Sequence, residues 1–299
     1  EDVRGEASSL RPEGDRALRF KCPRNGYVSF HLVVSGKQGG RFTLATRGAP
    51  QNVAVDFFRE WFHRDRKSGR YYPDALIPFV DPQTGEDLEG ATYDAAPFDV
   101  APGENAEVWV DLFVPPGTRP GRYEGTITVA AGSVELARVP VELEVWNFEL
   151  PAEIAMRSRF GSLGSRVAKV LGMDASSEEF AAIEKLYIDE LLRHRAVPAS
   201  LGDIWPEWTE EDGLRDTGQS ERLRMMVEEK HVNALPIPFR FRDEPEKCKA
   251  YLRAIAGWLR DLGYLDLAYI YLKDEPNNAE EYEIVRRQAC LLYTSDAAD

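Results

Sequence analysis

Two adjacent carboxylates, Asp274 and Glu275, are the residues whose type and position best suit chemistry in this sequence. They follow an apolar run, residues 267–273 (LAYIYLK), which predicts a buried strand. Enzymes built on parallel sheets carry catalytic groups just after the carboxyl ends of their strands. Two neighbouring carboxylates also repel each other, which raises the pKa of one and lets it act as a general acid near neutral pH. The pattern favours an active site, with a solvated acidic loop as the alternative.

The sequence contains Asp-Glu-Pro twice, and helix capping separates the two copies. In the first copy, Asp243 precedes a helical pattern and is expected to cap that helix at its N-terminus. After the second copy, the capping position is available to Asn277 or Asn278, each with a glutamate three residues later. Asp274 and Glu275 are therefore left without a visible structural role.

Residues 1–150 predict an N-terminal antiparallel β-sandwich. Apolar side chains alternate with period two in several short segments, and turns rich in Gly and Pro separate them. The alternating segments span residues 30–36, 41–48, 107–115, 122–130 and 139–151. Several short strands without helical periodicity between them are typical of a sandwich. Residues 51–92 are less regular and rich in aromatic side chains, so we expect long loops there.

Residues 151–289 predict an α/β domain in which strands and helices alternate. A strand and loop are expected at 156–164, strands at 196–205, 233–241 and 267–273, and helices at 177–194, 220–231, 244–262 and 280–288. Ser176 and Glu179 form a capping box at the start of the first of these helices. Four βα units in series favour a parallel sheet, either doubly wound or a (β/α)8 barrel. A full barrel needs about 250 residues, so this segment supplies only about the first half of one.

Composition argues against several other classes of protein. The chain has 37 Lys and Arg against 51 Asp and Glu, which disfavours a nucleic-acid-binding protein that tracks phosphates. No run approaches the roughly 18 apolar residues that predict a membrane-spanning helix. The three cysteines and four histidines show neither a disulfide framework nor zinc-ligand spacing, so we expect no zinc site. Oligomeric state is not indicated.

The ends of the sequence carry separate expectations. The chain begins with Glu1 rather than Met, which fits a removed signal peptide or a start within a gene, and we expect a secreted, periplasmic or cell-surface protein. Residues 290–299 (CLLYTSDAAD) fit no amphipathic pattern and resemble a translated sequencing adapter at the end of an environmental gene fragment. We expect the native sequence to stop near Ala289. Half a barrel exposes a strand edge and an apolar face, so this chain alone is expected to be inactive and poorly stable.

Three motifs together resemble glycoside hydrolase family 123 and its relatives that contain the domain of unknown function DUF4091. They are YIYLKDEP (269–276), YYPDALIP (71–78) and VPPGTRPGRYEGTITV (114–129). The resemblance spans most of the chain, and the combination is more specific than any single motif. It implies a β-sandwich followed by a (β/α)8 catalytic domain with β-N-acetylgalactosaminidase activity.

The resemblance also implies a substrate-assisted retaining mechanism on a β-linked N-acetylhexosamine at the end of a glycan or glycoconjugate. Glu275 would protonate the glycosidic oxygen and later activate water. Asp274 would orient the 2-acetamido group while its carbonyl oxygen attacks the anomeric carbon. The usual second carboxylate opposite the acid is then unnecessary, because the sugar supplies the nucleophile. The resemblance also implies that no metal and no organic cofactor is required.

Four further residues are candidate substrate contacts because each lies at or after the end of an expected strand. Arg159 ends the first strand, Asp203 and Trp205 end the second, and Tyr271 lies near the end of the fourth. Aromatic rings suit the apolar faces of pyranose sugars. The alternatives are a rim salt link for Arg159 and Asp203 and strand packing for Tyr271.

Two other functions stay open. The protein could be a non-catalytic carbohydrate-binding or cell-surface protein, in which the sandwich binds and the barrel is a degenerate scaffold. It could also be a glycosidase with a different sugar specificity, because a fold does not fix its substrate. Later strands that close a pocket around an acetamide would favour the hexosaminidase over the binding protein.

Overall fold

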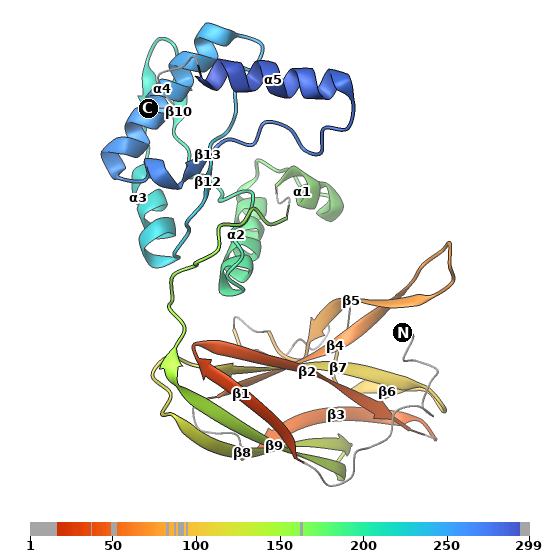
Figure 1. Ribbon diagram of the computed structural model, residues 1–299. Helices are drawn as coiled ribbons and strands as arrows, with labels where there is room; N and C mark the ends of the chain where they lie inside the picture. Colours follow the sequence, from red (N-terminus) through yellow and green to blue (C-terminus); the bar gives the residue numbers. More distant parts are fainter. Residues whose placement is uncertain are drawn as a thin grey trace. The chain divides into compact units, whose positions relative to one another are not determined.

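The computed structural model describes residues 17–36, 38–48, 53–81, 84–86, 88, 93, 95–161 and 164–293. The chain divides into two compact units, Glu1–Pro151 and Ala152–Asp299. Figure 1 shows the long strands gathered in the first unit and the helices in the second. Each unit has its own hydrophobic core.

Long strands build the first unit. They are β1 (Leu18–Arg24), β2 (Gly26–Ser35), β3 (Gly40–Arg47), β4 (Ala54–Arg64), β5 (Tyr71–Pro78), β6 (Phe98–Val100), β7 (Asn105–Val114), β8 (Gly121–Ala131) and β9 (Val134–Glu149). One sheet has four antiparallel strands in the order β2-β7-β4-β5, and the other has five strands in the order β1-β9-β8-β3-β6. The chain is thus rich in β-structure, as the alternating pattern predicts.

The core of the first unit draws on both sheets. Val108 and Val110 of β7 are fully buried. They belong to the same cluster as Leu44 of β3 and Leu143 of β9, which lie in the five-stranded sheet. Burial of these alternating positions confirms the inward face that period two predicts for these strands.

Residues 51–92 differ from their prediction, because long loops were expected there and the structure has strands β4 and β5. In β4 the run from Val55 to Trp61 is half-buried or buried at every position. Charged residues lie on both faces of this strand, with Arg59 on one face and Asp56 and Glu60 on the other. Apolar and polar residues therefore do not alternate, which explains why the strand was not predicted.

Strand β1 is a second difference, because it was not predicted and it pairs with β9 in parallel. The five-stranded sheet is therefore mixed, and the expectation of a purely antiparallel arrangement is wrong for this pair. Arg19 and Lys21 alternate with apolar residues along β1 and form ion pairs with Glu142 and Glu144 of β9. These cross-strand pairs match the register of the two strands.

Helices and very short strands build the second unit. They are α1 (Ser165–Leu171), α2 (Glu178–Arg193), β10 (Glu207–Thr209), β11 (Gly213–Arg215), α3 (Gln219–Arg224), a π-helical turn (Met225–Glu229), β12 (Leu235–Pro236), α4 (Pro245–Leu262), a 3-10 turn (Leu265–Leu267), β13 (Ala268–Tyr269) and α5 (Ala279–Tyr293). From β12 onward, the order of the elements confirms the predicted alternation of strands and helices. No helix within the described ranges combines the length and apolar character that crossing a membrane requires.

The expected parallel strands are much shorter than predicted. β12 pairs in parallel with β13 over two positions, and Phe160 forms a single parallel bridge with Pro198. The other described residues of the segments 156–164, 196–205 and 233–241, and residues 270–273, belong to no strand. Proline lacks the N–H that a sheet ladder needs, so Pro198 and Pro236 limit the pairing of their segments.

The core of the second unit centres on α4. Leu252, Ile255 and Leu259 are buried on one face of this helix. Leu223 of α3 and Leu235 of β12 pack in the same cluster and are fully buried. These residues recur at helical spacing in α4, and this periodicity made the helix predictable.

Two predicted helix caps are wrong. Helix α2 begins after Ser177, whose hydroxyl accepts the backbone N–H of Phe180 at 3.1 Å, so the cap lies one residue beyond Ser176. At the start of α4 the capping residue is Glu244, and no side-chain hydrogen bond closes the first turn. Asp243 therefore does not have the capping role that the sequence predicted.

The end of the chain also differs from its prediction. Helix α5 continues to Tyr293, and Leu291 and Leu292 pack against the core of the second unit. Leu291 lies two helical turns beyond Ile284, so an apolar face does continue past Ala289. The origin of residues 290–299 stays a prediction, and residues 294–299 lie outside the described part of the chain.

Candidate active site

A cleft of about 800 Å³ opens in the second unit, within the usual range for small-molecule sites. Four of the six predicted site residues line it: Arg159, Trp205, Tyr271 and Asp274. They come from the ends of three expected strand segments, and α5 contributes Ile284 and Gln288 to the lining. The rule that functional groups follow strand ends therefore brings these side chains together.

Asp274 is held by a short chain of contacts. The hydroxyl of Tyr271 donates a hydrogen bond of 2.7 Å to its Oδ1 atom. The Arg159 guanidinium lies over the Tyr271 ring, 4.2 Å from the ring centroid, which is a cation–π contact. The hydrogen bond to Asp274, followed by desolvation, raises the pKa of Tyr271, so the phenol stays protonated as a donor. One carboxylate oxygen is thus oriented before any ligand is present.

Glu275 follows directly but does not line the cleft as Asp274 does. Its side chain is exposed and its backbone has φ 41°, in the left-handed region. For a residue with a side chain this conformation costs about 1–2 kcal/mol, and such strain is concentrated at functional sites. The turn at Glu275 redirects the chain from β13 toward α5.

Capping of α5 does not use the acidic pair. Asn278 Oδ1 accepts the backbone N–H of Glu281 at 3.0 Å, and Glu281 Oε2 accepts the N–H of Asn277 at 2.9 Å. Lys273 forms an ion pair of 3.0 Å with the same Glu281. The Asn277 N–H, and then Lys273, lower the pKa of Glu281. Of the two predicted capping positions, Asn278 is confirmed, and Asp274 and Glu275 play no part in the cap.

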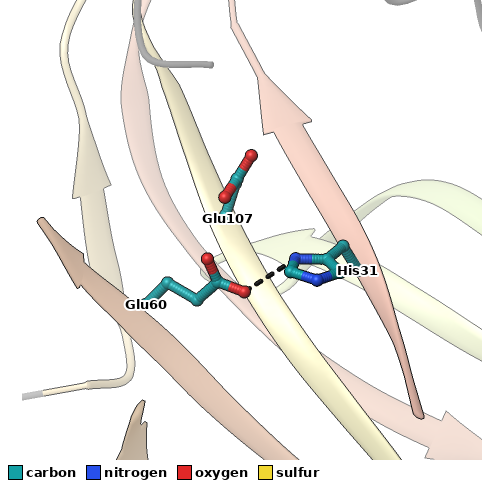
Figure 2. A group of neighbouring side chains, drawn as sticks. All are labelled: His31, Glu60 and Glu107. Carbon is teal, nitrogen blue, oxygen red and sulfur yellow. Dashed lines mark ion pairs between the residues drawn. The ribbon is translucent and has the colours of Figure 1, made fainter. Parts of the chain in front are cut away.

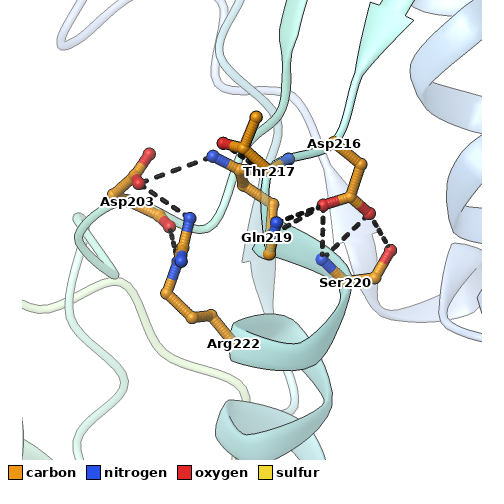
Figure 3. A network of polar contacts seen from close by, with 7 residues as sticks. Asp203, Asp216, Thr217, Gln219, Ser220 and Arg222 are labelled. Atoms are coloured by element: carbon orange, nitrogen blue, oxygen red, sulfur yellow. Dashed lines mark hydrogen bonds and ion pairs between the residues drawn. The ribbon is translucent and has the colours of Figure 1, made fainter.

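Asp203 is not among the cleft-lining residues, and Figure 3 shows why. Its carboxylate forms an ion pair of 2.9 Å with Arg222, whose Nε atom also donates to the Asp203 backbone oxygen at 2.7 Å. Gln219 adds a longer hydrogen bond of 3.5 Å to the same carboxylate. Asp203 therefore ties its loop to the start of α3, which matches the alternative of a rim salt link.

Trp205 provides an aromatic wall of the cleft and is half-buried. Its ring lies 6.2 Å from that of Trp258, and Trp258 Nε1 donates to the Ser220 hydroxyl at 3.0 Å. This packing limits the movement of Trp205. A fixed aromatic face in a cleft is suited to stacking against a sugar ring.

Two arginines of the cleft were missed by the sequence analysis. Arg166 lies on α1, a helix that was not predicted. Arg242 follows the third expected strand, and its Nε atom donates to the Phe239 backbone oxygen at 3.0 Å. The strand-end rule also applies to Arg242, which directly follows the third expected strand.

One solved structure shares the fold over nearly the whole chain. It is a family 123 glycoside hydrolase from Clostridium perfringens, studied for glycolipid glycan hydrolysis. The match has a TM-score of 0.59 and 11% sequence identity, and it covers 96% of this chain and 59% of that chain. At this identity the likeness shows a common fold, and this chain spans 59% of the length of that protein.

Other solved structures match much less of the chain. A Niemann-Pick type C2 protein from Japanese carpenter ant has 12% identity and a TM-score of 0.23, covering 42% of this chain and 79% of its own. A PapD-like domain of human CEP192 has 14% identity and a TM-score of 0.23, covering 48% and 92%. These scores are too low to support an argument. Neither the family models nor the curated proteins that were searched contain a match.

Proposed function

We propose that this chain belongs to a glycoside hydrolase related to family 123 and to the DUF4091-containing proteins. On this proposal the first unit is a β-sandwich and the second is the first half of a (β/α)8 catalytic domain. The main support is that Asp274 lines a cleft and accepts a hydrogen bond from Tyr271. The chain also shares the fold of a family 123 enzyme. The length of that enzyme, of which this chain spans 59%, supports a larger catalytic domain.

The proposed reaction is exo-acting hydrolysis of a β-linked N-acetylhexosamine such as an N-acetylgalactosaminide. Asp274 orients the 2-acetamido group, whose carbonyl oxygen attacks the anomeric carbon. Glu275 gives its proton to the glycosidic oxygen as that carbon–oxygen bond breaks. Water then attacks the oxazolinium-like intermediate and gives a proton back to Glu275, so the β-configuration is retained.

The environments of the two carboxylates suit these separate roles. Asp274 is fixed by Tyr271 and faces the cleft, as a group that positions an acetamide must be. Glu275 is exposed beside the cleft, where a leaving group departs toward solvent. Trp205 supplies a stacking face, and Arg166 and Arg242 supply hydrogen-bond donors for hydroxyl groups.

The substrate class also bears on where the protein works. A glycan or glycoconjugate with a terminal N-acetylhexosamine is the proposed partner. We place the protein in a secreted, periplasmic or cell-surface setting, because such glycans are exposed outside the cytoplasm. A fold does not fix the sugar or the linkage, so hydrolysis of defined substrates identifies both.

The test is hydrolysis of chromogenic N-acetyl-β-galactosaminide and N-acetyl-β-glucosaminide by the full-length protein that contains this chain. Glu275→Gln is expected to lower kcat by about 10²–10⁴-fold, the usual contribution of general acid–base catalysis. Glu280→Gln is the matched control, because Glu280 is an exposed carboxylate in the first turn of α5. Full activity of Glu275→Gln would contradict the acid assignment.

A second comparison tests the role of the acetamide. The same chromogenic sugars with a 2-hydroxyl group in place of the acetamide should not be hydrolysed, since they lack the nucleophile. Hydrolysis of the 2-hydroxy sugars instead would favour a glycosidase of different specificity. Glycan binding without turnover would favour the non-catalytic carbohydrate-binding protein.

A further inference from the structure

Three side chains of metal-ligating type meet on the four-stranded sheet of the first unit, far in sequence from the proposed catalytic pair. They are His31 of β2, Glu60 of β4 and Glu107 of β7 (Figure 2). One potential ligand atom of each lies within 4.8 Å of the others. Motif spacing could not reveal this group, because its members lie on three separate strands.

The register of the strands explains why these three side chains lie close together. β7 lies between β2 and β4. Val33 pairs with Glu107, and His31 lies two residues along β2 and so on the same face. Arg59 pairs with Val108, which places the next residue of β4, Glu60, opposite Glu107. The three side chains therefore project from neighbouring strands on one face of the sheet.

Burial of the two carboxylates is unusual. Glu60 is 5% exposed and Glu107 is 7% exposed, whereas the side chain of His31 is 49% exposed. Both carboxylate oxygens of Glu60 are buried without a hydrogen-bond donor in the described structure. His31 Nδ1 lies 2.7 Å from Glu60 Oε1, an ion-pair distance without the angles of a hydrogen bond. A buried carboxylate in this state is costly unless a cation or proton compensates it.

Glu60 and Glu107 lie opposite each other on neighbouring strands, and both carboxylates are buried. Two carboxylates that lie this close compete for one positive charge. A bound cation would satisfy both at once and would remove the need for a shared proton.

The donor set selects the kind of cation. One imidazole nitrogen and two carboxylates suit borderline divalent ions such as Zn²⁺, whereas Ca²⁺ prefers oxygen ligands alone. A tetrahedral Zn²⁺ site places its ligand atoms roughly 3.3 Å apart, so small side-chain movements from the observed spacing complete it. The exposed side of His31 leaves room for water at a fourth position.

The surroundings of His31 support an oriented ligand. Its ring makes an edge contact with Trp109, with centroids 4.8 Å apart. Trp109 is itself fixed, because its Nε1 atom donates to Asp111 Oδ1 at 2.7 Å. Contacts that restrict a ligating histidine strengthen metal binding.

We propose that His31, Glu60 and Glu107 bind one Zn²⁺-like divalent ion that ties β2, β7 and β4 together. This site is independent of the proposed hydrolase activity, because all of its ligands belong to the first unit. A ligand that binds only the folded state stabilises it, so the ion should stabilise the folded first unit.

The experiment is Zn²⁺ titration of the chelator-treated full-length protein, followed by calorimetry and by thermal unfolding. We expect one strongly bound Zn²⁺ per chain and a higher Tm. His31→Ala and Glu107→Gln should each weaken binding at least about tenfold. His63→Ala is the matched control, because His63 is an exposed histidine of β4 beside Asp74 and should leave the affinity unchanged.

A second readout protects the test against a variant that does not fold. Co²⁺ bound through His31 should give visible absorption bands that Zn²⁺ displaces and that His31→Ala abolishes. His31 is half-exposed, so its replacement removes little buried surface from the sheet. Absence of stoichiometric Zn²⁺ binding, or equal binding by wild type and His31→Ala, would overturn the proposal in favour of a carboxyl pair that shares a proton.

Discussion

Tyr271 donates a 2.7 Å hydrogen bond to Asp274 across the turn that follows β13. Arg159 lies against the ring of Tyr271, 4.2 Å from its centroid, and so restrains the donor. Arg159 thus restrains Tyr271, and Tyr271 in turn orients the carboxylate of Asp274. In the proposed mechanism Asp274 holds an acetamide in attacking position, and such a role gains from preorganisation because small misplacements are costly in rate.

Tyr271→Phe tests this dependence. The ring and its contact with Arg159 remain, but the donor to Asp274 is lost. If the proposed hydrolysis holds, kcat of the full-length protein toward a chromogenic N-acetylhexosaminide should fall about tenfold, with a smaller change in KM. Tyr187→Phe, which alters an exposed tyrosine of α2, is the control. An unchanged kcat for Tyr271→Phe would show that Asp274 needs no such support.

Glu275→Gly tests whether backbone strain accompanies function. Glycine adopts the left-handed conformation without penalty, so relief of the strain at φ 41° should stabilise the protein by up to about 1 kcal/mol. Loss of the proposed acid should remove activity at the same time. Urea unfolding and substrate hydrolysis, measured on one preparation, check both effects.

A matched glycine substitution separates strain in general from strain at the site. His231 also has a left-handed backbone, with φ 58°, but follows the π-helical turn away from the cleft residues. His231→Gly should stabilise the protein while leaving activity unchanged. A loss of stability in Glu275→Gly would show that its side chain contributes more to the fold than its backbone costs.

How much of the site was predictable from sequence depends on how local its signals are. The Asp274–Glu275 pair, its position after an apolar run, and its release from capping by Asn278 are all readable within a dozen or so residues. The convergence of Arg159 and Trp205 with Asp274 in one cleft followed from the strand-end rule. These predictions needed only chain order and periodicity.

The features that were missed depend on partners distant in sequence. Asp203 forms an ion pair with Arg222 instead of lining the cleft, and no local sequence pattern predicts this pair. β4 carries charged residues on both faces, so its apolar residues do not alternate. Glu60 and Glu107 meet only because their strands pair in one particular register. Sequence periodicity identifies a buried face, but register decides which side chains share it.

Asn278→Ala tests the separation of capping from catalysis. Asn278 caps α5, so this substitution should lower the free energy of unfolding by about 1 kcal/mol. Asp274→Asn should leave stability nearly unchanged and lower kcat instead, because Asp274 takes no part in the cap. Chemical unfolding and kinetics of both variants provide the measurement. Equal destabilisation by Asp274→Asn would show that the acidic pair has a structural role after all.

Asp216 offers a pH-dependent test of how the start of α3 is held (Figure 3). Its Oδ1 atom accepts the backbone N–H groups of Gly218 at 2.9 Å and Gln219 at 2.7 Å, and its Oδ2 atom accepts the Ser220 hydroxyl. The Ser220 hydroxyl first, and then these backbone N–H groups, lower the pKa of Asp216 from 3.8 to about 2. The folded state therefore favours the ionised carboxylate.

Asp216→Ala should cost about 1 kcal/mol of stability at pH 7, a value reduced from the full pKa shift because the carboxylate is exposed to solvent. The folded-state pKa is lowered, so the ionic contribution is complete above pH 3.8 and is lost as pH falls through about 2. The stability difference between wild type and variant should accordingly shrink between pH 4 and about pH 2.5 in urea unfolding. Glu211→Ala, an exposed carboxylate near β11, should show no such trend. A difference that stays constant down to about pH 2.5 would mean that ionised Asp216 does not stabilise α3.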